Sequence, residues 1–224
     1  MSLTARLLRR RHTPQGQKGL YRFAQGLRKA SRTAILNHLV LRHGYRDYLE
    51  IGVRTNDNFA RVVAPRKIGV DPAPEGPCTH VMTSDAYFAG LPPATNFDLV
   101  FIDGLHEATQ VRRDVEQALR HLRPQGTIVL HDCNPPTAWH QREECGEQAL
   151  AWNGTVWRAW AHFRCTRHDL RMHVVDTDWG VGIIQRGSQD VHRPAAAVLD
   201  FTYLEAHRRD LLNLISVERF LELY

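Results

Sequence analysis

Short apolar stretches alternate along this chain with stretches of helical periodicity, and this alternation limits the folds that the chain can adopt. Apolar residues recur at helical spacing between residues 106 and 123, which makes this the clearest predicted helix. The predicted strands around it are residues 45–53, 66–70, 80–82, 97–102 and 127–130. Strands that alternate with helices form a parallel sheet covered on both faces, so the sequence predicts an α/β fold.

The two ends of the chain differ from this central pattern. Residues 30–41 are predicted to form a short helix that ends at Gly44, and residues 203–224 form a predicted helical segment. Residues 170–175 and 180–185 have the spacing of an antiparallel closing pair of strands. We therefore divide the chain into a basic N-terminal helical extension (1–44), a core with a long, lid-like loop (45–190, loop 133–153) and a C-terminal helical segment (191–224).

Charge is distributed unevenly along the chain. Residues 1–46 contain 11 Lys or Arg and no Asp or Glu, whereas residues 47–224 contain 18 basic and 24 acidic residues. A basic arm of this kind can bind nucleic acid or an anionic membrane surface. We favour an arm that is solvated or packs on the acidic body, because only Tyr21 and Phe23 are there to stack on bases.

The sequence also indicates the cellular compartment of the protein. It contains no run of about 18 apolar residues, so we expect no membrane span. The basic N-terminus lacks the uninterrupted apolar stretch of a secretory signal. The four cysteines form no CxxC pair, which favours a reducing compartment. We therefore predict a cytoplasmic protein.

Acidic residues follow the predicted strands. In open α/β sheets, ligands bind beyond the carboxyl ends of the strands. The chain offers neither of the glycine-rich phosphate loops, GxGxxG and GxxxxGK[ST], at these positions, which disfavours an NAD-dependent oxidoreductase. S-adenosylmethionine suits clustered carboxylates, because it has a ribose diol, an ammonium and a sulfonium but no phosphate. The polar residues at the strand ends are Glu50, Asp71, Ser84, Asp85, Asp103, His131 and Asp132.

Four segments resemble class I S-adenosylmethionine-dependent methyltransferases, in particular small bacterial enzymes found near sugar, cell-surface glycan and natural-product pathways. They are YLEIGVRTNDNF, IGVDPAP, DLVFIDGLHEATQVRRDVEQALRHLRPQGTIVLHDCNPP and DTDWGVGII. The resemblance covers residues 45–186, and its most specific parts are IDGLH and HDCNPP. It implies a Rossmann-like sheet of seven strands whose last strand is antiparallel, with helical extensions at both ends.

The resemblance also assigns residues to the cofactor. It implies that Gly52 lets the backbone approach the methionine moiety, and that Asp71 accepts the ribose hydroxyls. Ser84 and Asp85 would face the adenine, and Asp103 would lie near the reacting centre. The loop has one glycine where many relatives have two or three. The implied cofactor-binding residues are Glu50, Gly52, Asp71, Ser84, Asp85 and Asp103.

A hydroxyl acceptor must lose a proton during methyl transfer, and His106 is our candidate general base. It follows Asp103 by three residues, in the turn that leads into the clearest helix. The pKa of an unperturbed histidine lies close to working pH, which suits this role. The alternative is a histidine that caps the helix or fills the core.

The second route is a hard cation such as Mg²⁺ on Asp103 and Asp132, which would lower the pKa of the hydroxyl. The resemblance to metal-dependent O-methyltransferases places the third ligand near Cys133. Cysteine binds Mg²⁺ poorly, so Asn134 or His131 would have to replace it.

Two further interpretations concern the same region. Asp132 could instead be a structural carboxylate bonded to the turn at 135–136, and a Zn²⁺ site on His106, His131 and Cys133 has no recognised spacing. Aromatic residues around the lid-like loop could stack on a sugar or planar acceptor. For Trp157 and Trp160 we favour the buried face of a helix. The candidate aromatic residues are Trp139, His140, Trp152 and Trp157.

We therefore predict an S-adenosylmethionine-dependent methyltransferase that acts on a hydroxyl of a small molecule or of a glycosyl or natural-product intermediate. The alternatives are an N-methyltransferase with the same cofactor, a nucleic-acid methyltransferase that uses the basic arm, and a non-catalytic binding module. A homodimer through the terminal helices is compatible with the predicted elements.

Overall fold

The computed structural model describes residues 30–145, 152–194 and 199–224. Most of the basic arm, residues 1–29, and part of the lid-like loop, residues 146–151, lie outside the described residues, so those predictions are not tested. The strands are β1 (Asp47–Ile51), β2 (Arg66–Asp71), β3 (His80–Val81), β4 (Phe97–Ile102), β5 (Leu122–Leu130), β6 (Leu170–Val175), β7 (Val181–Arg186) and β8 (Leu214–Ile215). The helices are α2 (Arg32–His43), α3 (Asp57–Arg61), α4 (Ser84–Ala89), α5 (Ala108–Arg120), α6 (Val156–Thr166), α7 (Phe201–Leu212) and α8 (Val217–Leu223).

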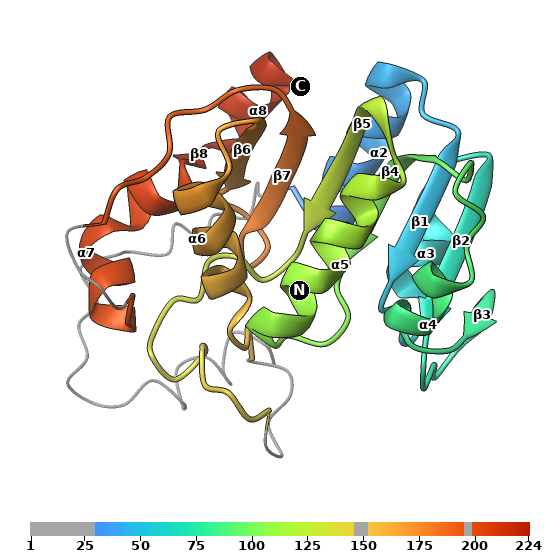
Figure 1. Cartoon of the computed structure of the whole chain (residues 1–224), viewed down its shortest axis with the longest axis horizontal. Coiled ribbons are helices and arrows are strands. Elements are labelled where there is room, and N and C mark those ends of the chain that lie inside the picture. The colour runs from blue at the N-terminus through green and yellow to red at the C-terminus, as the bar shows by residue number, and fades with distance from the viewer. Residues whose placement is uncertain (1–29, 146–151, 195–198) are drawn as a thin grey trace.

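These strands form a single sheet in the order β3-β2-β1-β4-β5-β7-β6-β8 (Figure 1). Within this sheet only β7 runs against the other strands, pairing antiparallel with both β5 and β6. The predicted α/β, Rossmann-like sheet and its antiparallel closing pair are therefore confirmed.

The sheet has eight strands where seven were expected. The additional strand is β8, which pairs parallel with the end of β6. It interrupts the C-terminal segment that was predicted to be helical throughout. Asn213 adopts a left-handed conformation, with φ of 48°, which ends α7 and turns the chain onto the sheet edge.

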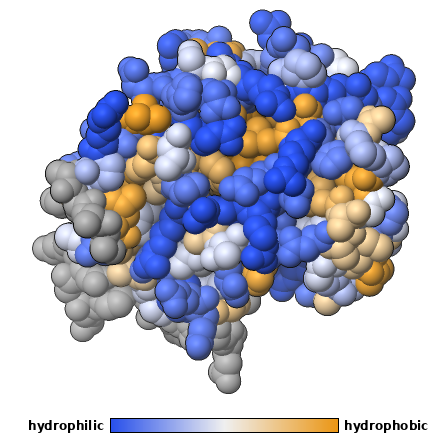
Figure 2. All heavy atoms as spheres, viewed as in Figure 1, coloured by the Kyte–Doolittle hydropathy of each residue, from blue (hydrophilic) through white to orange (hydrophobic). Residues whose placement is uncertain are grey.

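Both faces of the sheet are buried under helices. Successive residues of β4 alternate between the two apolar clusters: Leu99 and Phe101 pack with α2 and α8, whereas Val100 and Ile102 pack with α4, α5, α6 and α7. This explains why the strand is a continuous apolar run. Figure 2 shows that the outer surface seen from the side of α5 and α6 is mostly hydrophilic, with smaller apolar areas between.

One local prediction was wrong, and one helix was not predicted. Pro124 and Gly126 were expected to close the long helix, but they lie inside β5. The pairing of β4 with β5 shifts register between Phe97 and Leu99, and this bulge accommodates the proline. Helix α4 was not predicted; the Thr83 side chain begins it by accepting a hydrogen bond from the amide of Ala86.

Other local predictions are confirmed. Helix α2 ends at Gly44, which is left-handed with φ of 66°, and its amide caps the carbonyl of Val40. The long helix is α5, which covers residues within the predicted span. In the part of the chain that is described, no helix combines the length and apolarity needed to cross a bilayer.

Candidate active site

Two neighbouring strands bring the central acidic residues together. Ile102 of β4 pairs with Leu130 of β5, so Asp103 and the His131–Asp132 pair follow the strands at adjacent positions. His131 Nδ1 lies 3.2 Å from Asp103 Oδ1 and 2.9 Å from Asp132 Oδ2. Asp132 is in the left-handed region, with φ of 60°, a strained conformation for a residue with a side chain.

His106 completes this cluster. Its Nε2 lies 3.3 Å from Asp103 Oδ1 and 3.5 Å from Asp132 Oδ2. Its Nδ1 is buried and has no hydrogen-bond partner among the described residues. Because an ionised carboxylate can only accept hydrogen bonds, the neutral ring must carry its proton on Nε2 and its lone pair on Nδ1. The helix-cap interpretation of His106 is wrong, since the Thr155 hydroxyl oxygen accepts the hydrogen bond from the amide of Ala108.

Arg32, at the start of α2, is a member of the cluster that the sequence analysis missed. Its Nη1 lies 3.1 Å from His131 Nε2, and its Nε lies 3.7 Å from Asp103 Oδ2. Its backbone amide donates to Asp178 Oδ2 at 2.8 Å, and Asp178 stands in the turn between β6 and β7. Arg32 was counted with the basic arm, and only the packing of α2 on the sheet reveals its position.

Two carboxylates lie among three basic groups in this cluster. Burial raises the pKa of Asp103, but the neighbouring His131, His106 and Arg32 outweigh it and hold that pKa well below its ordinary value. Burial lowers the pKa of His131, but Asp132 and Asp103 outweigh it and raise that pKa well above its usual range. The pKa of His106 is raised in the same way. Charges buried at this cost are typical of functional sites.

The predicted metal ligands lie within this cluster. Asp103, His131 and Asp132 each offer one ligand atom, and the three atoms lie within 4.8 Å of one another. Of the two residues proposed to replace Cys133, His131 is the one that joins the carboxylates, because Asn134 Oδ1 accepts a hydrogen bond from Arg208. The donor set therefore fits a divalent cation that accepts one nitrogen ligand.

Asp132 does not bond to the turn that follows it, as one interpretation proposed. Its Oδ1 accepts a hydrogen bond from Asn153 Nδ2 at 2.7 Å, and its Oδ2 contacts His131. The Cys133 thiol is buried in the core and donates to the carbonyl of Leu130. Burial raises its pKa well above the ordinary value, so the thiol is a poor metal ligand.

Glu50 points toward the face covered by α2 and α3. Its Oε2 accepts hydrogen bonds from the Tyr48 hydroxyl and from Asn58 Nδ2. Burial raises the pKa of Glu50 to about 7, although these hydrogen bonds oppose the shift. Its carboxylate is thus occupied by neighbours that the sequence analysis missed, and its contact with a cofactor stays a prediction.

The two other residues predicted for the methionine and ribose moieties lie at the ends of β1 and β2. Gly52 has φ of 90°, and a Cβ there would lie 2.3 Å from the carbonyl oxygen of Asp103. Only glycine fits, because the chain after β1 packs directly against the chain after β4. Asp71 is buried, and its two carboxylate oxygens accept hydrogen bonds from the amides of Arg54 and Ala73, each at 2.8 Å. These amides fix the carboxylate at the sheet edge.

The pair predicted to face the adenine begins helix α4. The Ser84 hydroxyl donates to Asp114 Oδ1 at 2.6 Å, and Asp85 Oδ1 accepts from Gln110 Nε2 at 3.2 Å. Their hydrogen bonds thus join α4 to α5. Whether they also contact an adenine ring stays a prediction.

The lid-like loop, where it is described, packs closely. Trp152 Nε1 donates to the carbonyl of Arg142 at 2.8 Å, and Trp157 Nε1 donates to Gln141 Oε1 at 3.1 Å. The Arg142 guanidinium lies 4.0 Å above the Trp139 ring. Trp157 and Trp160 are fully buried, which confirms that they form the core face of their helix.

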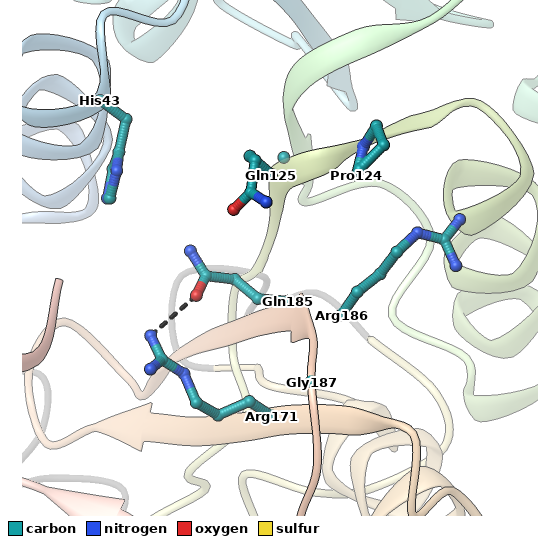
Figure 3. A pocket seen from close by; sticks show the side chains of 8 residues that line it. His43, Pro124, Gln125, Arg171, Gln185, Arg186 and Gly187 are labelled. Carbon is teal, nitrogen blue, oxygen red and sulfur yellow. Dashed lines mark hydrogen bonds between the residues drawn. The ribbon is translucent and has the colours of Figure 1, made fainter.

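A cavity of about 330 Å³ lies away from this cluster, at the opposite end of β5 (Figure 3). Arg171 and Gln185 point toward one another across neighbouring strands and are hydrogen bonded. None of the predicted site residues lines the cavity, so it is not the acceptor site proposed below. The lining residues are His43, Pro124, Gln125, Gly126, Arg171, Gln185, Arg186 and Gly187.

Taken together, the strand order and the polar cluster beyond β4 and β5 define the class I methyltransferase fold. The model of the family described as "Methyltransferase domain" matches residues 18–133, more than half of the chain. The chain therefore belongs to this methyltransferase family. No curated protein matches the sequence.

Solved structures with the same fold have low sequence identity to this chain. The O-methyltransferase TomG from Streptomyces achromogenes, involved in tomaymycin synthesis and solved with S-adenosylmethionine, has 17% identity and a TM-score of 0.50; the match covers 69% of this chain and 78% of that one. The methyltransferase PaMTH1 from Podospora anserina, solved with S-adenosylhomocysteine, has 12% identity and a TM-score of 0.53; the match covers 83% and 87%. These similarities establish a shared fold.

Proposed function

We propose that this methyltransferase transfers the methyl group of S-adenosylmethionine to a hydroxyl oxygen of a small molecule. One observation carries the choice of oxygen: His106 holds Nε2 on Asp103 while its buried Nδ1 has no partner in the described parts of the chain. That is the arrangement of a base ready to accept a proton. A neutral amine acceptor would attack without first losing a proton.

The residues at the carboxyl ends of the strands support the choice of S-adenosylmethionine as the cofactor. Asp71 is held by two backbone amides and keeps further lone pairs for a ribose diol. Both solved structures described above were obtained with S-adenosylmethionine or its demethylated product, which supports the same cofactor here. We propose that the acceptor binds beyond β4 and β5, beside Asp103 and His106.

Methyl transfer would then proceed as an in-line displacement. As the acceptor oxygen attacks the methyl carbon, the O–C bond forms, the S–C bond breaks and S-adenosylhomocysteine leaves. The hydroxyl proton passes to His106 Nδ1, and Asp103 stabilises the imidazolium through Nε2. A divalent cation, if the enzyme takes one, would be held by Asp103, Asp132 and His131 and would lower the pKa of the hydroxyl.

The test starts from the purified full-length chain. Calorimetry should show binding of S-adenosylmethionine, and a panel of catechols, other phenols and sugars should reveal an acceptor that yields S-adenosylhomocysteine. Absence of cofactor binding would overturn the proposal. A second assay that contains a chelator separates the two routes. If His106 acts as a base without a metal, the chelator should leave turnover unchanged.

A nucleic-acid acceptor is tested by removing residues 1–29. A small-molecule enzyme should keep its turnover, whereas an enzyme guided to nucleic acid by the basic arm should lose it in a salt-sensitive way. Loss of turnover on the small acceptor after this deletion would contradict the proposal.

A further inference from the structure

The residues that lead into α6 contact both the ring and the backbone of His106. This stretch, Trp152–Asn153–Gly154–Thr155, is called the WNGT segment below. The Trp152 indole stacks on the His106 imidazole, with ring centroids 5.0 Å apart and an interplanar angle of 23°. The contact is local to the proposed site, although 46 positions separate the two residues in the sequence.

The backbone of the WNGT segment also contacts the backbone of His106 directly. The Thr155 amide donates to the His106 carbonyl at 2.8 Å. Gly154 is left-handed, with φ of 57°, and a Cβ there would lie 2.2 Å from the same carbonyl oxygen. Because the Thr155 hydroxyl also caps Ala108, the segment fixes the turn that carries His106 onto the start of α5.

The segment is itself anchored. Trp152 Nε1 donates to the Arg142 carbonyl at 2.8 Å, and the Asn153 amide donates to the His140 carbonyl at 2.8 Å. The buried Asn153 side chain holds Asp132. The indole therefore has a fixed position against which the imidazole can rest.

We propose that Trp152 is a positioning residue, which holds the His106 ring in the plane where Nε2 meets Asp103 and Nδ1 keeps its lone pair for the proton of the acceptor. The ring has a hydrogen bond on its Nε2 side only, so stacking supplies the second constraint on its rotation. This inference rests on the proposed function for the role of His106, but the position of the ring can be tested without an acceptor.

The first test measures how fast diethyl pyrocarbonate modifies His106 in the full-length chain, with peptide mapping by mass spectrometry. Trp152→Leu removes the stacking plane, and we expect His106 to react roughly tenfold faster, as the loss of one aromatic pair predicts. Trp152→Phe keeps a ring and should stay within about twofold of the wild type. The exposed His168 serves as the internal reference. Equal His106 rates in the wild type and Trp152→Leu would overturn the inference.

The second test uses an acceptor found in the panel described above. We expect Trp152→Leu to lower kcat by about a hundredfold and to leave the KM for S-adenosylmethionine unchanged, because misplacing a base costs rate rather than cofactor affinity. Trp152→Phe should restore most of kcat. A rise in KM alone, or no rescue by phenylalanine, would show that Trp152 only supports the fold.

Two controls keep these outcomes separate. If the wild type does not bind S-adenosylmethionine, the proposed function fails, while the modification test still decides the role of Trp152. If Trp152→Leu does not fold, Thr155→Val removes the cap on Ala108 and leaves the stacked rings in place. Because the indole still stacks on the imidazole, we expect the His106 rate of this variant to stay within about twofold of the wild type. A tenfold rise would show that the cap, and not the indole, holds the ring, and it would overturn the inference.

Discussion

The two ends of strands β1, β4 and β5 carry similar charged residues in opposite surroundings. At the amino end, Asp47 accepts bidentate hydrogen bonds from Arg66, and Arg123 bridges Asp47 and Asp98. The Arg66 and Arg123 side chains are about half exposed, at 56% and 47%. Asp98 also accepts the amides of Arg46 and Asp47, so these charges join neighbouring strands.

At the carboxyl end Asp103 is about as buried as Asp47 and Asp98, which are each 18% exposed, but the histidine beside it is buried too. The side chains of Asp103, His131 and Asp132 are only 15%, 4% and 7% exposed. Solvent-exposed pairs contribute little to stability and cost little to make, whereas buried charges pay a desolvation penalty that hydrophobic residues would avoid. This difference supports a structural role for the amino-end cluster and supports the proposed role of the carboxyl-end cluster in the reaction.

The largest effect should come from the proposed base. We expect His106→Gln to lower kcat by roughly a hundredfold to ten-thousandfold, because the hydroxyl proton loses its acceptor. Release of S-adenosylhomocysteine measures the rate, and His168→Gln, at an exposed position, is the matched control. A loss of less than about threefold would remove His106 from the mechanism.

Stability should respond strongly at the same end of the sheet. His131→Leu leaves Asp103 and Asp132 buried without the imidazole hydrogen bonds between them, and we expect a loss of about 3–5 kcal/mol in the free energy of unfolding. Urea denaturation measures this loss. If the change stays below about 1 kcal/mol, the cluster is better solvated than its burial indicates, and the contrast between the two ends weakens.

Glu50 provides a test that depends on pH. Its pKa is raised to about 7 in the folded state, so the folded chain holds a proton that the unfolded chain releases at lower pH. The contribution of Glu50 to stability is therefore fully present at pH values below the ordinary carboxyl pKa. It is lost as the pH rises through about 7.

Glu50→Gln should remove this dependence. Relative to the wild type, the variant should gain up to about 3 kcal/mol between about pH 5 and pH 8, as measured by urea denaturation. Parallel pH profiles for the two proteins would contradict the raised pKa of Glu50.

The smallest effect belongs to the amino end. Arg66→Ala removes an exposed partner of Asp47, and we expect a loss of stability far smaller than that of His131→Leu, which shrinks further in high salt. Turnover should not change. A loss as large as that of His131→Leu would show that exposure is a poor guide to the value of these ion pairs.

The sequence was sufficient for the parts of the fold that depend on local patterns. Strand β4 was evident because both of its faces are buried, and Asp103 and Asp132 were evident because they follow strands directly. The face of the sheet toward which the Glu50 side chain points could also be predicted from the sequence, since the pleat of β1 places it on the same face as Tyr48. Strand β8 has only two residues and leaves no periodicity to detect.

The contacts of the candidate site that the sequence analysis missed have no local signal. Arg32 belongs to a helix far from the strand ends in the sequence, and it reaches His131 only because α2 packs across the sheet. Trp152 was a candidate for stacking on an acceptor, but it resembles any other aromatic residue of the lid-like loop, and nothing in the sequence placed it against His106. Contacts between residues so distant in the chain depend on tertiary packing, which neither spacing nor composition encodes.

Gly52 has a mechanical consequence. Its amide donates to Val70 of β2, the Asp103 amide donates to Ile51 of β1, and the two loops touch at a point that admits no methyl group. Three strand ends are thereby locked into one rigid unit. A shift of the backbone at Gly52 would therefore displace the backbone of Asp103, the aspartate that contacts His106.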